Sequence, residues 1–418
     1  MRDQSNEDPR VSDKEKSNTD MRESLNYSTK EPVVETEPVN KKIYWYSVIA
    51  GFAVLAPWNA VLTCLYFFET LYEPDYDPQF TLPMIIFFPL TSCQILLLAF
   101  GKNLPMRAKV VGSLAMLTFF FYMFLFLCKY IENKATSFYI AVITCLLIGG
   151  FNAVSQSSIT GLCGALGGNG LYMNGIMLGN GVSGVLSSLL QFICMAVFGT
   201  EEEDLFHSTT AFFIVTALLM IFSTYISYRL LEDPLTQEVL KRAPAEKTLK
   251  EIFSQAWPVF KGQGKNVFLV FVFTFIVFPG VYIAKPLSFL SVQWSIPFMI
   301  FLFNLFDTIG RYTPSFIRIV SPKGTTWLCI LRGLSSLSIC LIGYGTFNGF
   351  FVSDWWIILN FIIFAFTNGA ASTYAMMYGT EEFPNEQKEN AGRMMAFFLT
   401  FGIFTGSLLA QLVFEELF

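Results

Sequence analysis

Long apolar runs separated by short polar breaks make up the chain from residue 43 onward. The runs are roughly 18 to 28 residues long, and a helix of that length crosses the hydrocarbon core of a bilayer. Backbone groups inside a bilayer must pair within the protein, so these runs predict helices and not barrel strands. We expect eleven membrane-spanning helices, at 43–68, 81–100, 110–128, 137–160, 171–199, 208–228, 267–284, 294–318, 325–345, 355–378 and 394–414.

The charged residues are few and unevenly placed. The 418 residues are 53% hydrophobic and only 14% charged, whereas soluble domains carry about 25% charged residues. Residues 1–40 alone hold 16 of the 59 charged residues. The remainder cannot cover a water-exposed surface, which excludes a soluble multidomain protein and indicates an integral membrane protein. The net charge is −5, and no basic patch interleaved with aromatics predicts nucleic-acid binding.

The pattern predicts an all-α integral membrane fold of six and five helices. Residues 1–42 are polar, lack a signal-peptide core and are expected to form a disordered cytoplasmic tail. Residues 43–228 form the first bundle, 229–266 a cytoplasmic loop, and 267–418 the second bundle.

The lysines and arginines predict the orientation. With the amino terminus inside and eleven spans, 22 of these residues fall on the cytoplasmic side and 3 on the outer side. Cytoplasmic segments of membrane proteins are enriched in Lys and Arg. We therefore expect a cytoplasmic amino terminus and an extracellular carboxyl terminus, with the plasma membrane as the default location.

An ion pair inside the eighth span is the first candidate site. Asp307 is the only carboxylate deep in any predicted span, and Arg311 follows four residues later on the same helix face. Asn304 extends that face. Ionisable groups inside a membrane are costly and usually functional. The pair predicts substrate contact or a gate, with a structural lock between helices as the alternative.

The first span contains a second candidate. Pro57 is predicted to kink the helix, and Trp58 lies 15 residues into the span, too deep for an interfacial belt. Trp58 therefore predicts a cavity wall, with packing as the alternative. Asn59 is expected to form a helix–helix hydrogen bond.

Three further polar residues interrupt apolar spans. Gln156 has an amide that can either read a base edge or bond to another helix, and Asn368 marks a polar break in the tenth span. Arg332 is expected to snorkel or to pin a loop. Nine of residues 161–184 are glycines, which predict close helix packing and not a phosphate loop, because no GxxxxGK[ST] motif is present.

The cysteines and the histidine predict no chemistry. All eight cysteines lie in apolar segments without a CxxC pair, and His207 lies beside an acidic run at a span end. We expect no metal, no cofactor and no catalytic site.

Taken together, these motifs resemble those of the equilibrative nucleoside transporter family. In chain order they are Pro57-Trp58-Asn59, Gly150-Phe151-Asn152-Ala153-Val154-Ser155-Gln156-Ser157, Gly179-Asn180-Gly181-Val182-Ser183-Gly184, Phe303-Asn304 through Asp307 to Gly310-Arg311, Thr367-Asn368-Gly369, and Ala391-Gly392 with Met395-Ala396-Phe397-Phe398-Leu399. The most specific of them is the stretch from Phe303 to Arg311.

The resemblance implies a major-facilitator-like fold with two helical bundles around a central cavity. It implies transport of nucleosides, or of nucleobases in some members, down their gradient by alternating access. Trp58 is then expected to flank the base and Gln156 to hydrogen-bond it, while Asp307 and Arg311 address the ribose hydroxyls. Leu55 and Leu62 are expected to line the same wall as Trp58. The only Asn-x-Ser/Thr acceptor, Asn26, departs from the family pattern because it lies in the predicted cytoplasmic tail.

Other readings remain open. A polyol or sugar carrier is the nearest alternative, because Asp, Asn, Gln and Trp also suit sugars. A proton-coupled carrier is another, although Arg311 favours an ionised Asp307 and so favours uniport. A receptor or scaffold needs neither eleven spans nor a mid-membrane ion pair, and no residues for an enzyme are evident. Apart from small nucleosides or nucleobases and the lipid bilayer, we expect no obligate partner.

Overall fold

The computed structural model describes residues 39–72, 74–76, 78–100, 104–199, 201–241, 249–278, 287–343 and 353–414. Within these ranges the regular elements are all helices. The predicted disordered tail lies outside the described residues, except that helix α2 already begins at Lys41. The side chain of Asn40 accepts a hydrogen bond from the backbone of Lys42, which caps this helix.

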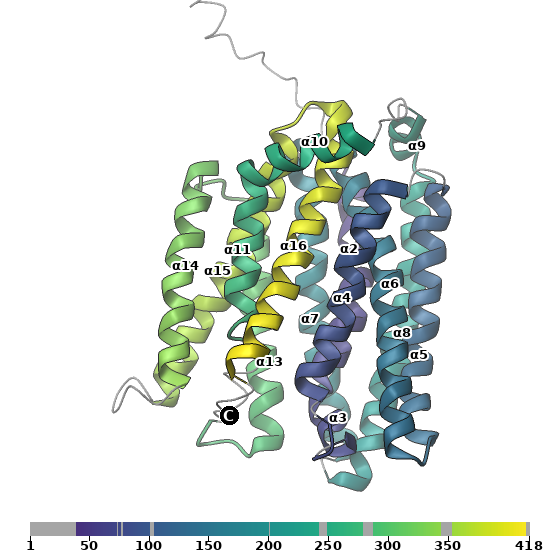
Figure 1. The fold of residues 1–418 in the computed structure, drawn as a ribbon, viewed down its shortest axis with the longest axis vertical. Coiled ribbons are helices and arrows are strands. Elements are labelled where there is room, and N and C mark those ends of the chain that lie inside the picture. The colour runs from purple at the N-terminus through teal and green to yellow at the C-terminus, as the bar shows by residue number, and fades with distance from the viewer. Residues whose placement is uncertain are drawn as a thin grey trace, which may run out of the picture. The chain divides into compact units, whose positions relative to one another are not determined.

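Six long helices occupy the positions of the first six predicted spans (Figure 1). They are α2 (Lys41–Thr63), α4 (Pro78–Phe100), α5 (Ser113–Tyr130), α6 (Lys134–Leu166), α7 (Leu171–Phe198) and α8 (Glu202–Leu231). Helix α2 continues through Pro57 and ends at Thr63, and a short helix α3 (Leu65–Tyr72) follows it. The first predicted span therefore consists of two helices.

The second half contributes five further helices. They are α11 (Lys265–Phe275), α13 (Val292–Tyr312), α14 (Pro322–Gly343), α15 (Asp354–Glu381) and α16 (Asn385–Phe414). Helix α13 ends six residues earlier than residue 318, because a 3-10 turn, Thr313–Ser315, follows it.

Eight of the described helices are long and apolar enough to cross a membrane. The other three predicted spans correspond to α11, of which 11 residues are described, and to α13 and α14, which carry Asp307, Arg311 and Arg332. An all-helical membrane fold is thus confirmed, whereas the count of eleven spans stays a prediction.

The segment predicted as a cytoplasmic loop, 229–266, is largely helical where it is described. Helix α8 extends to Leu231, and α9 (Pro234–Lys241) and α10 (Leu249–Val259) follow. A π-helical turn, Phe260–Gly264, leads into α11. Both short helices lie at the same end of the helical unit in Figure 1.

Residues 40–418 form one compact unit. The N-terminal helices α2–α8 and the C-terminal helices α11–α16 each pack among themselves, with α2 against α7 and α13 against α15 as major pairs. The two groups also meet directly, through α6 with α16, α7 with α13, and α4 with α16. This arrangement leaves the inner faces of both groups around a shared interior.

Glycines allow the closest of these contacts. A Cβ added at Gly179 would lie 1.9 Å from the carbonyl oxygen of Val48, and one at Gly369 would lie 1.9 Å from that of Asp307. Only glycine permits backbones to approach this closely. The predicted packing role of the glycines around 161–184 is confirmed at Gly179, Gly181 and Gly184.

Basic side chains gather at the end where α2 begins, which we call the basic end (Lys42, Arg107, Arg318 and Arg393). Lys42 pairs with Asp233 at 3.0 Å and Arg107 pairs with Glu232 at 2.5 Å. Arg318 pairs with Glu381 at 3.6 Å. Helix α16 ends at the opposite end of the unit (Figure 1).

Candidate functional site

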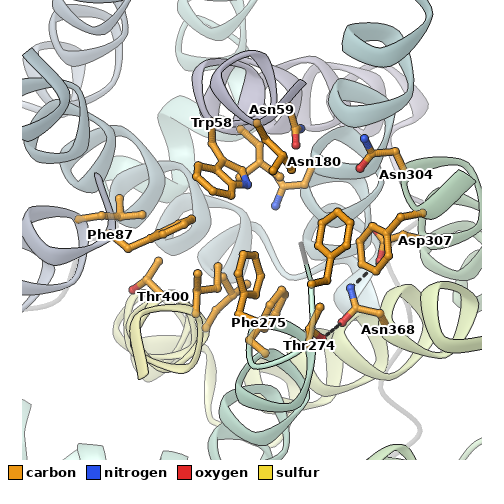
Figure 2. Close-up of a pocket in the computed structure, with 18 of the residues that line it drawn as sticks. Trp58, Asn59, Phe87, Asn180, Thr274, Phe275, Asn304, Asp307, Asn368 and Thr400 are labelled. Atoms are coloured by element: carbon orange, nitrogen blue, oxygen red, sulfur yellow. Dashed lines mark hydrogen bonds between the residues drawn. The ribbon is translucent and has the colours of Figure 1, made fainter. Parts of the chain in front are cut away.

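A central cavity lies between the N-terminal and the C-terminal helices (Figure 2). Its lining atoms leave about 650 Å³ of space free of protein atoms, open solvent included. Its walls are mostly aromatic and aliphatic, with a few polar groups. The lining residues are Leu55, Trp58, Asn59, Leu62, Phe87, Leu90, Gln156, Asn180, Phe271, Thr274, Phe275, Phe278, Phe303, Asn304, Asp307, Arg311, Asn368, Leu399, Thr400 and Ile403.

The structure brings nine of the ten singled-out residues to this cavity. They are Leu55, Trp58, Asn59, Leu62, Gln156, Asn304, Asp307, Arg311 and Asn368. The tenth, Arg332, does not line the cavity but donates a hydrogen bond to Thr274, which does. Residues from four predicted spans therefore converge on one place.

The predicted ion pair forms one wall of the cavity. Arg311 Nε donates to Asp307 Oδ2 at 2.6 Å, and both residues are only 4% exposed. Asn368 Nδ2 donates to the other oxygen, Oδ1, at 2.7 Å, as the dashed line in Figure 2 shows. Both carboxylate oxygens are thus bonded, yet each keeps a lone pair for a further donor.

A chain of hydrogen bonds extends from the ion pair into the C-terminal helices. Thr274 Oγ1 donates to Asn368 Oδ1 at 2.7 Å. Arg332 Nη2 in turn donates to Thr274 Oγ1 at 2.8 Å. The chain joins α14, α11, α15 and α13, so the position of Asp307 depends on four helices.

Arg332 corrects one of the predictions. It is 2% exposed, and its guanidinium lies 4.0 Å from the ring centroid of Phe364. It donates to Thr367 and to the carbonyl oxygen of Phe364 on α15. The snorkelling reading is wrong, because these partners and the ring hold the charge inside the helix bundle.

Arg311 also reaches the N-terminal helices. Its Nη1 lies 3.4 Å from the carbonyl oxygen of Met177 on α7. Its own carbonyl oxygen accepts a hydrogen bond from Asn174 Nδ2 at 3.0 Å. The ion pair therefore lies where α13 contacts α7, and not within one bundle alone.

Trp58 stands on the opposite side of the cavity in Figure 2. It is 4% exposed, and its ring centroid is 4.6 Å from that of Phe87 and 6.2 Å from that of Phe275. Both contacts are angled and not stacked, at 60° and 47°. Three rings from α2, α4 and α11 thus form an aromatic wall facing the ion pair.

Two asparagines combine lining with helix packing. Asn59 Nδ2 donates to Ser183 Oγ at 2.9 Å, which confirms its predicted helix–helix hydrogen bond. Asn304 Nδ2 donates to Ser188 Oγ at 3.1 Å and to the carbonyl oxygen of Gly184 at 3.2 Å. Both asparagines attach their helices to α7.

Gln156 is bonded to a residue that no sequence pattern singled out. Gln94 Nε2 donates to Gln156 Oε1 at 3.4 Å, so the alternative of an interhelical bond is realised while Gln156 also lines the cavity.

Sequence reasoning also missed several lining residues. Asn180 and Thr400 are polar interruptions of apolar spans, and that signal was available. Phe87 and Phe275 carried no signal, because the chain has 46 phenylalanines.

The remaining candidate groups lie apart from the cavity. Among the residues that the structure describes, no cluster of His, Cys, Asp or Glu could hold a metal ion. His207 lies near the start of α8, beside the ring of Phe206.

Comparisons with known proteins point to one family. The family model described as Nucleoside transporter matches residues 140–235 and 235–415. The Arabidopsis thaliana protein Equilibrative nucleotide transporter 8 is 26% identical over 399 residues, covering 91% of this chain and 97% of its own length. Human Equilibrative nucleoside transporter 1 is 28% identical over 378 residues, covering 79% of each chain.

Two solved structures share the fold. The major facilitator proton:xylose symporter XylE superposes with a TM-score of 0.63 at 10% identity, over 90% of this chain and 89% of its own. The major facilitator transporter FucP, in an outward conformation, gives 0.55 at 12% identity, over 90% and 92% of the two chains. The expected major-facilitator-like arrangement is therefore confirmed.

Proposed function

Because this chain belongs to the nucleoside transporter family, we propose that it carries nucleosides across a membrane by facilitated diffusion, exposing the central cavity to each side in turn. The observation that carries the proposal is the cavity itself, in which a buried ion pair faces an aromatic wall. A nucleoside is neutral, with hydroxyl groups at one end and a flat base at the other, and the two walls match these ends.

The ion pair suits the ribose. A pair of vicinal hydroxyls can donate to the carboxylate of Asp307 and accept from the guanidinium of Arg311. Hydrogen bonds to charged groups are worth about 1.5–3 kcal/mol each. Since Arg311 and Asn368 already orient the carboxylate, the sugar meets a fixed acceptor.

The aromatic wall suits the base. Stacking on an aromatic side chain is worth roughly 1–3 kcal/mol per base, and Trp58 offers the largest face in the cavity. Gln156 offers an amide to a base edge. Leu55 and Leu62 complete the wall on α2, one turn on either side of Trp58.

Alternating exposure requires contacts between the two helix groups that can separate. At the basic end, the glycines of α6 and α16 pack together, with an added Cβ at Gly392 only 2.7 Å from the carbonyl oxygen of Thr160. Asn174 accepts hydrogen bonds there from Tyr44 at 3.0 Å and from Ser315 at 2.7 Å. These contacts support a conformation that is closed at the basic end.

The energetic mode follows from the surroundings of Asp307. Proton coupling needs a group that gains and loses a proton during the cycle. Both oxygens of Asp307 accept hydrogen bonds, one from the arginine and one from the amide, and the relatives are named equilibrative transporters. We take uniport as the mechanism, with the basic end cytoplasmic, the plasma membrane as the location, and free nucleobases as additional substrates.

The test is uptake of labelled adenosine, uridine, hypoxanthine and glucose in cells without carriers of their own. We expect saturable entry of the nucleosides, without accumulation above the external concentration and without an effect of a protonophore. Saturable glucose entry without nucleoside entry contradicts the proposal and favours a sugar carrier. Accumulation that a protonophore abolishes contradicts uniport alone.

A further inference from the structure

Gln94 is a buried amide that the proposed mechanism does not use. It lies on α4, is 0% exposed, and does not line the cavity. It nevertheless connects two lining residues: its Nε2 donates to Gln156 Oε1 at 3.4 Å, and its Oε1 accepts from Thr400 Oγ1 at 2.9 Å. These two hydrogen bonds, which we call the relay, connect α16 through α4 to α6 and end at the cavity.

The relay determines which end of Gln156 faces a ligand. In this arrangement the Oε1 of Gln156 is occupied by Gln94. Among the described residues none accepts a hydrogen bond from Gln156 Nε2, so the NH₂ group is left to donate toward the cavity. A primary amide has one donating and one accepting end, so orienting one end orients both.

The hydroxyl of Thr400 allows the opposite arrangement. Its single proton has three acceptors in reach: Gln94 Oε1 at 2.9 Å, and the carbonyl oxygens of Phe397 and Ala396 at 3.1 and 3.2 Å. If the proton goes to its own helix, Thr400 Oγ1 can accept from Gln94. Gln94 then turns its carbonyl to Gln156, and Gln156 presents its own carbonyl to the cavity. Every buried group keeps a partner in both arrangements, so the reversal leaves no unpaired group.

Helices α4 and α6 pack closely beside the relay. An added Cβ at Gly149 would lie 2.3 Å from the carbonyl oxygen of Ile86, so α4 and α6 are in direct backbone contact. Close packing limits changes in the separation of Gln94 and Gln156, so we take turning of the amides as the adjustable element.

We propose that Gln94 is a positioning residue that lets Gln156 present either a donor or an acceptor to the base, so that the cavity accepts base edges of both polarities. This inference rests on the proposed function. The ligands that distinguish the two arrangements are adenosine and inosine, two purine nucleosides of the same shape. Their base edges carry donor and acceptor groups in opposite order. Adenosine has an amino group and a ring-nitrogen acceptor where inosine has a carbonyl and an N–H.

The test compares transport efficiency for adenosine and inosine. Because the relay serves both edges, the wild-type efficiencies should agree within about threefold. Gln94→Met removes the partner of Gln156, and Thr400→Val removes the partner of Gln94. An unpaired buried carbonyl is tolerated better than an unpaired N–H. In both variants Gln156 therefore keeps its NH₂ toward the cavity, and the adenosine-to-inosine ratio should shift at least about threefold in the same direction.

Two further variants provide the controls. Thr400→Ser keeps the hydroxyl that Thr400→Val removes, so its adenosine-to-inosine ratio should lie close to the wild-type value. Thr91→Val removes a buried hydroxyl on α4, the helix of Gln94, that has no hydrogen-bond partner among the described residues. This variant should leave the adenosine-to-inosine ratio unchanged.

The outcomes separate this inference from the proposed function. Absence of saturable uptake of either nucleoside by the wild type contradicts the proposed function. Normal uptake with an unchanged ratio in Gln94→Met and Thr400→Val, or with opposite shifts, overturns only the relay. A wild-type preference above about threefold also overturns it. If Gln94→Met does not reach the membrane, the test is the adenosine-to-inosine ratio of Thr400→Val compared with that of Thr400→Ser.

Discussion

Asn368 on α15 donates its hydrogen bond to Oδ1 of Asp307, the carboxylate oxygen that Arg311 leaves open. The acid is therefore held by one partner on its own helix and by another 61 residues away. This double attachment makes the carboxylate a fixed acceptor in the cavity wall.

The first prediction concerns this carboxylate. Asp307→Asn should nearly abolish nucleoside uptake, because it leaves the guanidinium of Arg311 buried without its counter-ion, which typically costs about 3–5 kcal/mol. Arg311→Ala should do the same. Uptake is measured with surface abundance, because a folding defect also lowers transport. Asp75→Asn serves as the control, since it removes an exposed pair with Lys134 that is worth at most about 1 kcal/mol. Normal transport by Asp307→Asn at normal abundance means that the pair is only structural.

The second prediction concerns the chain behind the ion pair. Arg332→Met should raise the KM for nucleosides, because Thr274 and Asn368 lose the group that orders them. Thr274→Val should act in the same direction by a smaller factor. Since both side chains belong to one network, the double variant should lose less than the sum of the single losses. Additive effects indicate independent structural roles.

The third prediction concerns the aromatic wall. Trp58→Ala should raise KM by roughly 5- to 150-fold, the equivalent of about 1–3 kcal/mol of lost stacking. Trp58→Phe keeps an aromatic face and should have a smaller effect. The measurement is uptake kinetics at matched surface abundance. An unchanged KM in Trp58→Ala, with only abundance reduced, assigns Trp58 to packing.

The fourth prediction concerns closure at the basic end. Asn174 on α7 and Ser315 after α13 are joined by a 2.7 Å hydrogen bond between the two helix groups. In the double variant Asn174→Cys/Ser315→Cys, oxidation should cross-link the groups and stop uptake, and a reductant should restore it. The two single variants control for the native cysteines. Full uptake by a cross-linked protein shows that this contact does not have to open.

The fifth prediction concerns orientation. Helix α2 begins at the basic end and α16 ends at the opposite one, and cytoplasmic segments carry the excess of Lys and Arg. An epitope appended after Phe418 should therefore be stained on intact cells, and Asn26 should carry no glycan. Staining that requires permeabilisation reverses the assignment or indicates a miscounted span.

The sequence by itself determined the features that depend on neighbouring residues. Apolar runs of bilayer length produce the long helices, whose positions agree with the predicted spans to within a few residues at most ends. The Asp307–Arg311 pair was also predictable, because a four-residue spacing places two side chains on one helix face whatever the helix packs against. A polar residue inside an apolar span was informative for the same reason, because the free-energy cost of placing its side chain in lipid can be seen from that span alone.

Only the tertiary structure decided which of these residues share a cavity. Thr400 and Gln94 are separated by 306 residues and Arg332 and Thr274 by 58, and no helical periodicity relates positions on different helices. Their meeting depends on helix approach, which glycines such as Gly369 set to within a few ångströms. The same holds for Phe87 and Phe275, which became cavity walls while most other phenylalanines did not. A phenylalanine side chain is equally stable against lipid, in a helix interface or in a cavity wall. Only the packing of the helices therefore determines which of these environments it occupies.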